Sequence, residues 1–588
     1  MVASWHDLTL YKFKKAEEKN KTDLLLQKEE YSYIQRDEFT SEIFKIEIQH
    51  MPRFGFSELR KKLLHLELHP IKIKGFPHNG YAFVTFRNEE DRESAISKLH
   101  GFQWKGHRLI AKKSRPSADP LVLKRKTAPD SDQNAKKQKL NDEANDLNEN
   151  LTPDERLKNA VMPLHNFPYS EQLNTKSSNM KSVLTKLTWE VHNNCYELRD
   201  WLKECKSKNS GCICEILPIM PSPVLTGYRN KSEFTIGMNL EGTERVVGFR
   251  FGSYREGSSA VGDPSNCSIL PDAMTKVAKV FQEFVHQSQY PVYDAQTHEG
   301  YWRQLTVRTT TLGDIMAIPE FCSQQLSLAD IEEVKNSLKT FFSEGPGKEC
   351  GVTCLYFNCL NNKHASSGRS NEYEFLMGEE WITESLLDLK FQISPDAFFQ
   401  VNNMATALLY KQIAEWCCLE ADNVVLDICC GTGTIGITLA KHVKKVIGVE
   451  MSARAVEDAK RNAVLNGVEN IEFHCAKAED VTEQIKVWTR CGKAVAIVDP
   501  PRPGLRGKVM YAIRRCRQIS RVIYVSCNPT AAIQNFMDLI RPVSRRMKGE
   551  AFYPVKAIPV DLFPHTKHCE LVLLFERRKT KSDADDTD

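Results

Sequence analysis

Two short motifs in the final third of the chain hold side chains suited to covalent catalysis. Cys527 stands in the sequence Ser-Cys-Asn-Pro at 526–529, and Glu570 ends the sequence His-Cys-Glu at 568–570. A thiolate can add to an electron-poor carbon atom, and a carboxylate can then remove a proton so that the adduct breaks down. The pair would suit methylation at C5 of a uracil ring, because addition of sulfur to C6 makes C5 nucleophilic.

The residues around Cys527 predict where its thiol lies. The apolar run at 522–525 is typical of a buried strand, and the Asn-Pro pair that follows Cys527 ends it. Ligands of open α/β sheets bind at the carboxyl ends of strands, so the thiol is expected at such an end. The alternative is that Cys527, one of eighteen cysteines, is only a small buried apolar residue.

A glycine-rich turn indicates a site for the methyl donor. The apolar residues 424–428 predict a strand, Gly431 and Gly433 follow it, and residues 435–441 predict a helix. Glycines allow the backbone to approach a ligand at the start of a helix. Dinucleotide-binding enzymes and ordinary turns share this pattern, so it does not by itself identify the ligand.

Two acids end the strands that follow. Glu450 ends a predicted strand at 445–450 and suits bonding to ribose hydroxyls, although a solvated acid at a strand end is the alternative. A third strand is predicted at 470–473, and a fourth at 494–498 is followed by Asp499. The alternation of strands and helices predicts an α/β fold with a doubly wound, Rossmann-like sheet.

Five motifs in this order resemble the RNA 5-methyluridine methyltransferases, over residues 215–577. They are Phe-Phe-Gln-Val-Asn at 398–402, the Gly-rich turn at 427–433, Asp-Pro-Pro-Arg at 499–502, Ser-Cys-Asn-Pro at 526–529, and Asp-x-Phe-Pro-x-Thr-x-His-x-Glu at 561–570. The resemblance implies a methyltransferase that depends on S-adenosylmethionine. It extends to the animal members that modify the T-loop uridine of cytosolic tRNA, and other RNAs with a uridine loop are further candidate substrates.

The resemblance also implies a role for individual residues. Cys527 would be the nucleophile, Glu570 the proton acceptor, and Arg502 a candidate for positioning the substrate. Cys429 stands where bacterial members carry an aromatic residue. The residues expected to contact the cofactor are Gln400, Cys429, Gly431, Gly433, Glu450 and Asp499. No metal is expected, and no iron–sulfur cluster, because Cys205, Cys212 and Cys214 lack the C-x-x-C spacing of such sites.

An RNA-recognition motif is predicted at 41–116. Residues 79–86 fit its octapeptide signature except at the first position, and the elements around them predict the order β-α-β-β-α-β. Tyr81 and Phe83 would share one sheet face, where bases can stack. Glu47 stands where an aromatic residue normally stacks and would repel phosphate, so the alternative is that this domain binds protein.

The remaining segments complete the domain organisation. The mixed α+β central domain should bind RNA, and Arg229 and Lys231 are its candidate contacts, unless they pair with Glu233. The expected boundaries are an N-terminal extension at 1–40, the RNA-recognition motif at 41–116, a charged flexible linker at 117–160, the central domain at 161–390, the methyltransferase domain at 391–577 and a polar tail at 578–588.

Composition limits the cellular setting. The net charge is only +4, so RNA affinity must come from local patches, such as the basic stripe at 105–126, unless that stripe is only a solvated surface. No apolar run is long enough to cross a membrane, and eighteen cysteines fit a reducing compartment. We therefore expect a cytosolic protein. The basic residues at 124–139 resemble a bipartite nuclear localisation signal, which adds the nucleus as a second location.

Three other functions share part of this pattern. A cytosine-5 RNA methyltransferase uses the same addition chemistry but carries a Pro-Cys in the fourth-strand motif, where this chain has Pro-Pro-Arg at 500–502. An amino-methyltransferase would need neither Cys527 nor Glu570. A catalytically silent RNA-binding scaffold would not need them either, so the presence of both residues favours an enzyme. The sequence indicates no particular protein partner.

Overall fold

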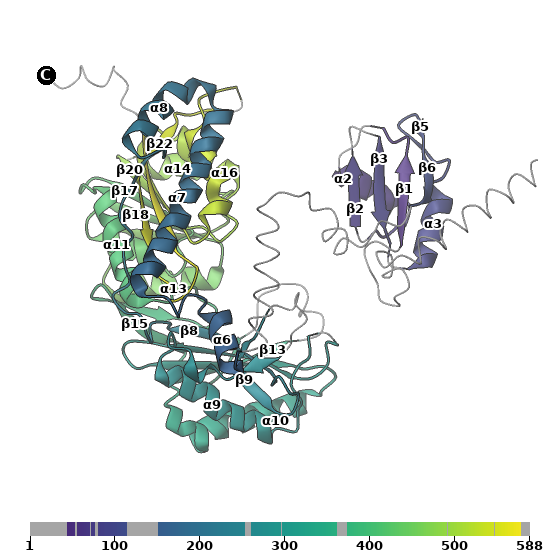
Figure 1. Ribbon diagram of the computed structural model, residues 1–588, viewed down its shortest axis with the longest axis vertical. Coiled ribbons are helices and arrows are strands. Elements are labelled where there is room, and N and C mark those ends of the chain that lie inside the picture. The colour runs from purple at the N-terminus through teal and green to yellow at the C-terminus, as the bar shows by residue number, and fades with distance from the viewer. Residues whose placement is uncertain are drawn as a thin grey trace, which may run out of the picture. The chain divides into compact units, whose positions relative to one another are not determined.

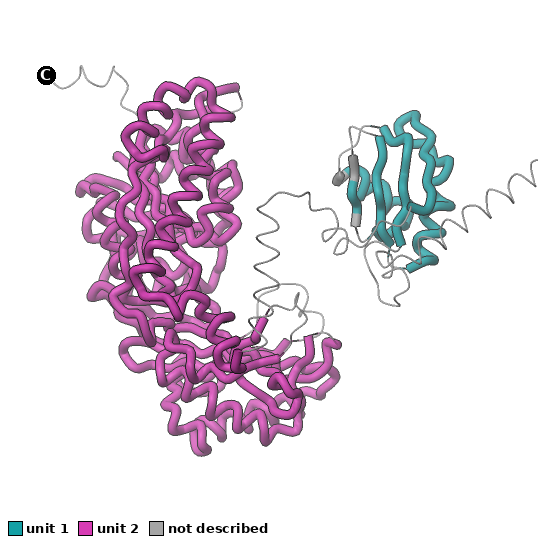
Figure 2. Tube along the Cα trace, viewed as in Figure 1, with its two compact units in different colours: residues 1–149 teal, residues 150–588 magenta. Residues whose placement is uncertain are grey.

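The computed structural model divides the chain into two compact units, residues 1–149 and 150–588 (Figure 2). The extension at 1–40, the tail at 578–588 and the basic segment at 124–139 lie outside the described residues. The described residues are 44–52, 56–70, 72–76, 80–86, 88–114, 151–252, 260–295, 297–360, 373–490, 492–545 and 547–577.

The first unit is a four-stranded antiparallel sheet with two helices, in the order β2-β3-β1-β6. Ile46 and Ile48 alternate with more exposed residues, and Ala82 and Val84 do the same, so one face of the sheet is buried. The predicted β-α-β-β-α-β order is confirmed. Its elements are β1 Lys45–Gln49, α2 Phe56–His65, β2 Lys72–Phe76, β3 Tyr81–Thr85, α3 Glu89–Leu99 and β6 Ile110–Lys113, with a small hairpin of β4 Gln103–Trp104 and β5 His107–Arg108.

The second unit contains an eight-stranded sheet in the order β19-β18-β17-β20-β21-β23-β22-β7. The five strands from β17 to β21 are parallel, which confirms the doubly wound sheet, and β23 and β22 extend it antiparallel. Its strands are β7 Glu215–Ile216, β17 Val424–Ile428, β18 Lys445–Glu450, β19 Ile471–Cys475, β20 Ala494–Val498, β21 Ile519–Ser526, β22 Phe552–Val560 and β23 Glu570–Arg577.

Helices cover both faces of this sheet (Figure 1), which is why β17 and β20 are buried along their whole length and, apart from Asp427 in β17, apolar. One face packs against α11 Asn403–Cys417 and α12 Thr434–Ala440, with α13 Ala453–Leu465 beside them. The other face packs against α7 Tyr169–Asn194, α8 Arg199–Lys208, α14 Gln484–Trp488, α15 Gly507–Arg515 and α16 Pro529–Ile540.

A seven-stranded sheet forms the rest of the second unit, in the order β10-β9-β8-β11-β12-β13-β14. The apolar faces of α9 and α10 cover one side of this sheet. The hairpin of β15 and β16 packs against α11 and shares the core beside the eight-stranded sheet. Its elements are β8 Lys231–Met238, β9 Arg245–Arg250, β10 Val261–Gly262, α9 Asp272–Gln287, β11 Trp302–Thr309, β12 Ile315–Cys322, α10 Leu328–Ser343, β13 Cys354–Leu360 and β14 Tyr373–Gly378, followed by β15 Ile382–Leu386 and β16 Leu389–Ile393.

Two segments differ from the expected domain limits. The end of the expected linker is helical, because Thr152 and Glu155 form a capping box that starts α6 Pro153–Val161. The helix α7 lies in the expected central domain, but its apolar stripe packs on the eight-stranded sheet. The strand β7 also joins that sheet, beside β22. The start of the expected central domain therefore belongs structurally to the core around the eight-stranded sheet.

Candidate active site

Cys527 lies between a strand and a helix. The strand β21 ends at Ser526, and the side chain of Asn528 caps α16, whose first residue is Pro529. The thiol is consequently half-buried at the carboxyl edge of the sheet, whereas Cys516 and Cys569 are buried. The Asn-Pro pair thus has the predicted effect of ending the strand and leaving Cys527 accessible.

Strand register brings Glu570 to the same edge. Ser526 of β21 pairs with Leu571 of the antiparallel β23, so the residues next to them at this edge are Cys527 and Glu570. On its other side, Glu570 pairs with Val560 of β22. The Glu570 side chain is only 2% exposed. A thiol and a buried carboxyl group therefore adjoin at one end of two neighbouring strands.

Electrostatic interactions join four side chains in this site. Burial and the nearby Asp499 raise the pKa of Glu570 well above its usual value. Burial, Glu570 and Asp499 raise the pKa of Cys527, whereas the Arg502 guanidinium lowers it. Arg502 is exposed in the turn after β20. Its position therefore allows it to favour the thiolate and to meet a bound substrate.

The glycine-rich turn has the backbone geometry of a ligand cradle. Gly431 and Gly433 have φ angles of 55° and 79°, and Cys429 also has a positive φ of 67°. A Cβ atom on Gly433 would lie 2.8 Å from the Phe473 ring, whereas open space adjoins Gly431. A side chain at Gly431 would enter the space where the backbone can approach a ligand.

Glu450 ends β18, as predicted, and its carboxylate faces this turn. Oε2 accepts a hydrogen bond of 3.1 Å from the Gly431 amide, and Oε1 accepts one of 2.9 Å from the Ser452 amide. The carboxylate therefore fixes the turn as well as adding negative charge to the edge of the cradle.

Asp427 is a further candidate that the sequence reasoning did not single out, although it begins the Gly-rich motif. It is wholly buried, and Oδ2 accepts a 2.9 Å hydrogen bond from the Gly436 amide. Oδ1 has no hydrogen-bond partner among the described residues. Burial raises the pKa of Asp427 to about 7, and that of Asp499 to about 7 as well. The orphaned oxygen and the open space beside Gly431 fit a polar nucleoside cofactor.

Gln400 and Arg229 lie in two segments that contact each other. Arg229 and Asn402 form an isolated antiparallel bridge. The Asn230 amide donates to the Val401 carbonyl (2.9 Å), and Asn230 Nδ2 donates to the Gln400 carbonyl (3.0 Å). The start of the central sheet is therefore attached to the segment that holds Gln400. Burial lowers the pKa of His568, two residues before Glu570, and the positive charges of Arg502, Lys176 and Arg229 lower it further.

Lys231 has the alternative role considered from the sequence, because its Nζ forms an ion pair of 2.7 Å with Glu233. Both side chains line a polar cavity of about 180 Å³ on the central sheet. The other residues around it are Gln304, Thr306, Ile318, Glu320, Asn358, Tyr373 and Pro395.

In the first unit, Tyr81 and Phe83 lie on one sheet face with their ring centroids 5.8 Å apart and their planes at 79°. Glu47 pairs with Phe83 across the strands, so its carboxylate lies on this face, as the sequence predicts. Its Oε2 lies 3.6 Å from Lys112 Nζ on the other neighbouring strand. The negative charge on this face is therefore partly compensated, and the expected repulsion of phosphate is weaker than Glu47 alone implies.

Two features are missing from the described part of the chain, a cluster of metal ligands and a membrane-spanning helix. Across the residues described above, no three His, Cys, Asp or Glu side chains are grouped so as to hold a metal ion. Within the same ranges, no helix is long and apolar enough to span a membrane.

The fold and the site define the class of protein. A parallel sheet with a Gly-rich turn after its first strand, an acid at the end of its second and an antiparallel extension is the fold of an S-adenosylmethionine-dependent methyltransferase. The model of the tRNA (Uracil-5-)-methyltransferase family matches residues 363–578, and that of the RNA recognition motif matches residues 71–110. The chain belongs to the tRNA (uracil-5-)-methyltransferase family.

Individual relatives agree with this assignment. Human tRNA (uracil-5-)-methyltransferase homolog A is 44% identical over 548 residues, which cover 93% of this chain and 85% of that protein. Human homolog B is 39% identical over 429 residues, covering 72% of this chain and 84% of that protein. The crystal structure of Pyrococcus abyssi tRNA (uracil-54, C5)-methyltransferase with S-adenosyl-L-homocysteine has a TM-score of 0.51 at 23% identity, covering 70% of this chain and 84% of that one. It shows the same fold.

Proposed function

We propose that this protein methylates C5 of uracil in tRNA, and that its target is the T-loop uridine of cytosolic tRNA. The observation that carries the proposal is the register of β21 and β23, which sets the thiol of Cys527 beside the carboxyl group of Glu570. Membership of the family and the 44% identity to human homolog A support tRNA as the substrate class.

The cofactor would be held by Cys429, Gly431 and Gly433 of the Gly-rich turn, by the acids Glu450 and Asp499, and by Gln400 on the segment that contacts Asn230. The orphaned oxygen of Asp427 would offer it a further polar partner. When bound there, S-adenosylmethionine supplies an electrophilic methyl group. The fit rests on the open space beside Gly431 and on the acids around it.

The side chains of the chain itself account for the remaining chemistry. The thiolate of Cys527 forms a bond to C6 of uracil, and the electron pair of the C5–C6 double bond becomes an enolate. C5 of the enolate takes up the methyl group and still bears its hydrogen atom. The carboxylate of Glu570 then takes that proton, the electron pair restores the C5–C6 bond, and the C6–S bond breaks.

The other domains would bind the RNA. Arg229 is attached to the segment of Gln400 and interacts with His568, so it can contact a nucleotide that enters the site. Tyr81 and Phe83 offer a stacking surface on a separate unit. We infer a protein of the cytosol that enters the nucleus through its basic segment, and one that works without an iron–sulfur cluster.

A direct test compares 5-methyluridine in RNA from cells with and without the protein, at nucleotide resolution. Loss of the modification from the T-loop of cytosolic tRNA is expected, with restoration by the wild-type chain. The purified protein should also methylate a tRNA transcript and leave a transcript with cytidine at that position unmodified. An unchanged T-loop and an inactive purified protein would contradict the proposal.

A further inference from the structure

An ion pair between Lys176 on α7 and Asp561, which follows β22, is completely buried. Lys176 Nζ lies 2.6 Å from Asp561 Oδ1, and neither side chain has any exposed surface. Burial of two charges is expensive, and well-packed apolar residues in their place are often as stable or more so. Stability alone therefore does not explain the presence of this pair.

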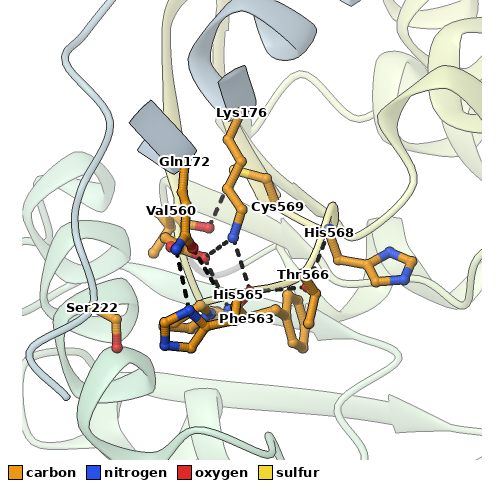
Figure 3. A network of polar contacts seen from close by, with 12 residues as sticks. Gln172, Lys176, Ser222, Val560, Phe563, His565, Thr566, His568 and Cys569 are labelled. Carbon is orange, nitrogen blue, oxygen red and sulfur yellow. Dashed lines mark hydrogen bonds and ion pairs between the residues drawn. The ribbon is translucent and has the colours of Figure 1, made fainter. Parts of the chain in front are cut away.

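One face of α7 holds the Asp561 segment through several bonds (Figure 3). The carboxylate of Asp561 accepts from Lys176, from the Tyr169 hydroxyl (3.0 Å) and from the Phe563 amide (3.1 Å). Lys176 also donates to the Phe563 carbonyl (2.8 Å). Gln172 Oε1 accepts from the His565 amide (2.9 Å). Tyr169, Gln172 and Lys176 are spaced by three and four residues, so they project from the same side of the helix.

These bonds fix the connection that leads to the proposed base. Residues 561–569 join β22 to β23, and Glu570 is the first residue of β23. The connection has no helix or strand of its own. Two further bonds hold it, because the Pro564 carbonyl accepts from the Tyr228 hydroxyl (2.9 Å) and the His565 carbonyl accepts from the Leu164 amide (2.9 Å).

We propose that Lys176 is a positioning residue for Glu570, acting through the Asp561 carboxylate and the connection at 561–569. The inference rests on the proposed function of Glu570. Cys527 directly follows β21 and precedes Asn528, the N-cap of α16, so it is fixed separately from the connection and loss of Lys176 leaves the nucleophile in place. Displacement of the connection moves the first residue of β23 instead. Removal of the C5 proton should therefore slow while addition of the thiolate continues.

The variant to test is Lys176→Met with Asp561→Asn, which removes both charges and leaves neither unpaired. A matched control is Arg514→Met. Arg514 is also a wholly buried cation, and it donates to the carbonyls of Asp538 (2.9 Å) and Gly549 (2.9 Å). Its own carbonyl accepts from Arg577, at the opposite end of β23 from Glu570. The control therefore disturbs the same core without touching the connection.

Denaturing gels would follow the covalent adduct with a tRNA transcript, and filter binding would follow RNA affinity. Breakdown of the adduct should slow about 10-fold or more in the double variant, because small displacements of a catalytic group cost up to about 10²-fold. Adduct formation and RNA affinity should match the Arg514→Met control. Equal adduct lifetimes in the double variant and the control would overturn the inference.

Two other results also test the inference or the proposed function on which it rests. If the double variant does not fold, Tyr169→Phe is the variant to use, because it removes one donor to Asp561 and leaves the ion pair intact. A longer adduct lifetime in Tyr169→Phe supports the inference. A wild-type adduct lifetime overturns it. Absence of both adduct and 5-methyluridine with the wild-type protein would instead count against the proposed function itself.

Discussion

Asp499, which is half-buried, and Glu570, which is buried, are two carboxyl groups whose charges interact. Asp499 follows β20, Glu570 begins β23, and the negative charge of Asp499 contributes to the raised pKa of Glu570. A carboxyl group with a raised pKa keeps its proton to a higher pH than an exposed one. Glu570 must be ionised to accept a proton, so the rate of adduct breakdown should rise with pH until Glu570 has ionised.

Replacement of Asp499 with Asn should shift this pH dependence. Without the Asp499 charge, the pKa of Glu570 falls, a larger fraction is ionised at a given pH, and the rising part of the profile moves to lower pH. Single-turnover breakdown of a preformed adduct, measured at saturating cofactor across a pH series, would show the shift. A shift to higher pH, or none, would mean that Asp499 does not interact with the base.

The pKa of Cys527 provides a second pH test. Arg502 lowers that pKa, so Arg502→Ala should raise it and slow adduct formation at neutral pH. The deficit should shrink as the pH rises, because the thiolate then forms without help. Arg506→Ala is a matched control, since Arg506 is an exposed arginine in the same turn that pairs with Glu479. A deficit that is independent of pH would assign Arg502 to substrate binding alone.

Glu450 should contribute to cofactor affinity. Glu450→Ala removes the carboxylate that accepts from Gly431 and Ser452, and we expect S-adenosylmethionine binding to weaken by about 1–3 kcal/mol. Calorimetry with the cofactor and with tRNA would separate this loss from RNA binding. Glu472→Ala is the control, because Glu472 is an exposed acid on the neighbouring β19 that forms ion pairs with Lys445 and His474 and does not belong to the Gly-rich turn. Equal cofactor affinity in both variants would reject the role.

The RNA-recognition motif should add affinity without being required for turnover. Tyr81→Ala with Phe83→Ala should weaken tRNA binding, since each stacked base contributes about 1–3 kcal/mol. Removal of residues 1–116 should weaken binding further but leave methylation in place, and the extra loss on truncation should be largest at low salt, because truncation also removes basic residues of the stripe at 105–126. Filter binding across a salt series would measure this. Equal tRNA affinities for the full-length, doubly substituted and truncated proteins would assign the motif to a protein partner.

The sequence predicts the catalytic sheet well and the contacts of its loops poorly. Residues 445–450 and 494–498 have the predicted bounds of β18 and β20, because an apolar β-branched run between turns has few alternatives. The packing of α7 on the catalytic sheet was not predicted, since an apolar stripe on a helix does not indicate which surface covers it. Lys176 and Asp561 are separated by 385 positions, and no local pattern links them.

The same holds for the site, where the sequence predicts the residues better than it predicts their contacts. Motifs located the thiol, the glycines and the acids Glu450 and Asp499 because these residues end or follow predicted strands. The bond from the Gly431 amide to Glu450 and the pairing of Glu47 with Lys112 depend on packing between segments. Such contacts cannot be predicted from the sequence, because several residues of suitable charge along the chain could be the partner in each contact.

The most direct measurement is covalent trapping with two variants of the central pair. Wild-type protein, Cys527→Ala and Glu570→Gln would each be mixed with a tRNA transcript and S-adenosylmethionine, then resolved on denaturing gels. We predict no adduct and no methylation with Cys527→Ala, and an adduct that forms but persists with Glu570→Gln, because only elimination needs the base. Methylation by Cys527→Ala at the wild-type rate would contradict the account.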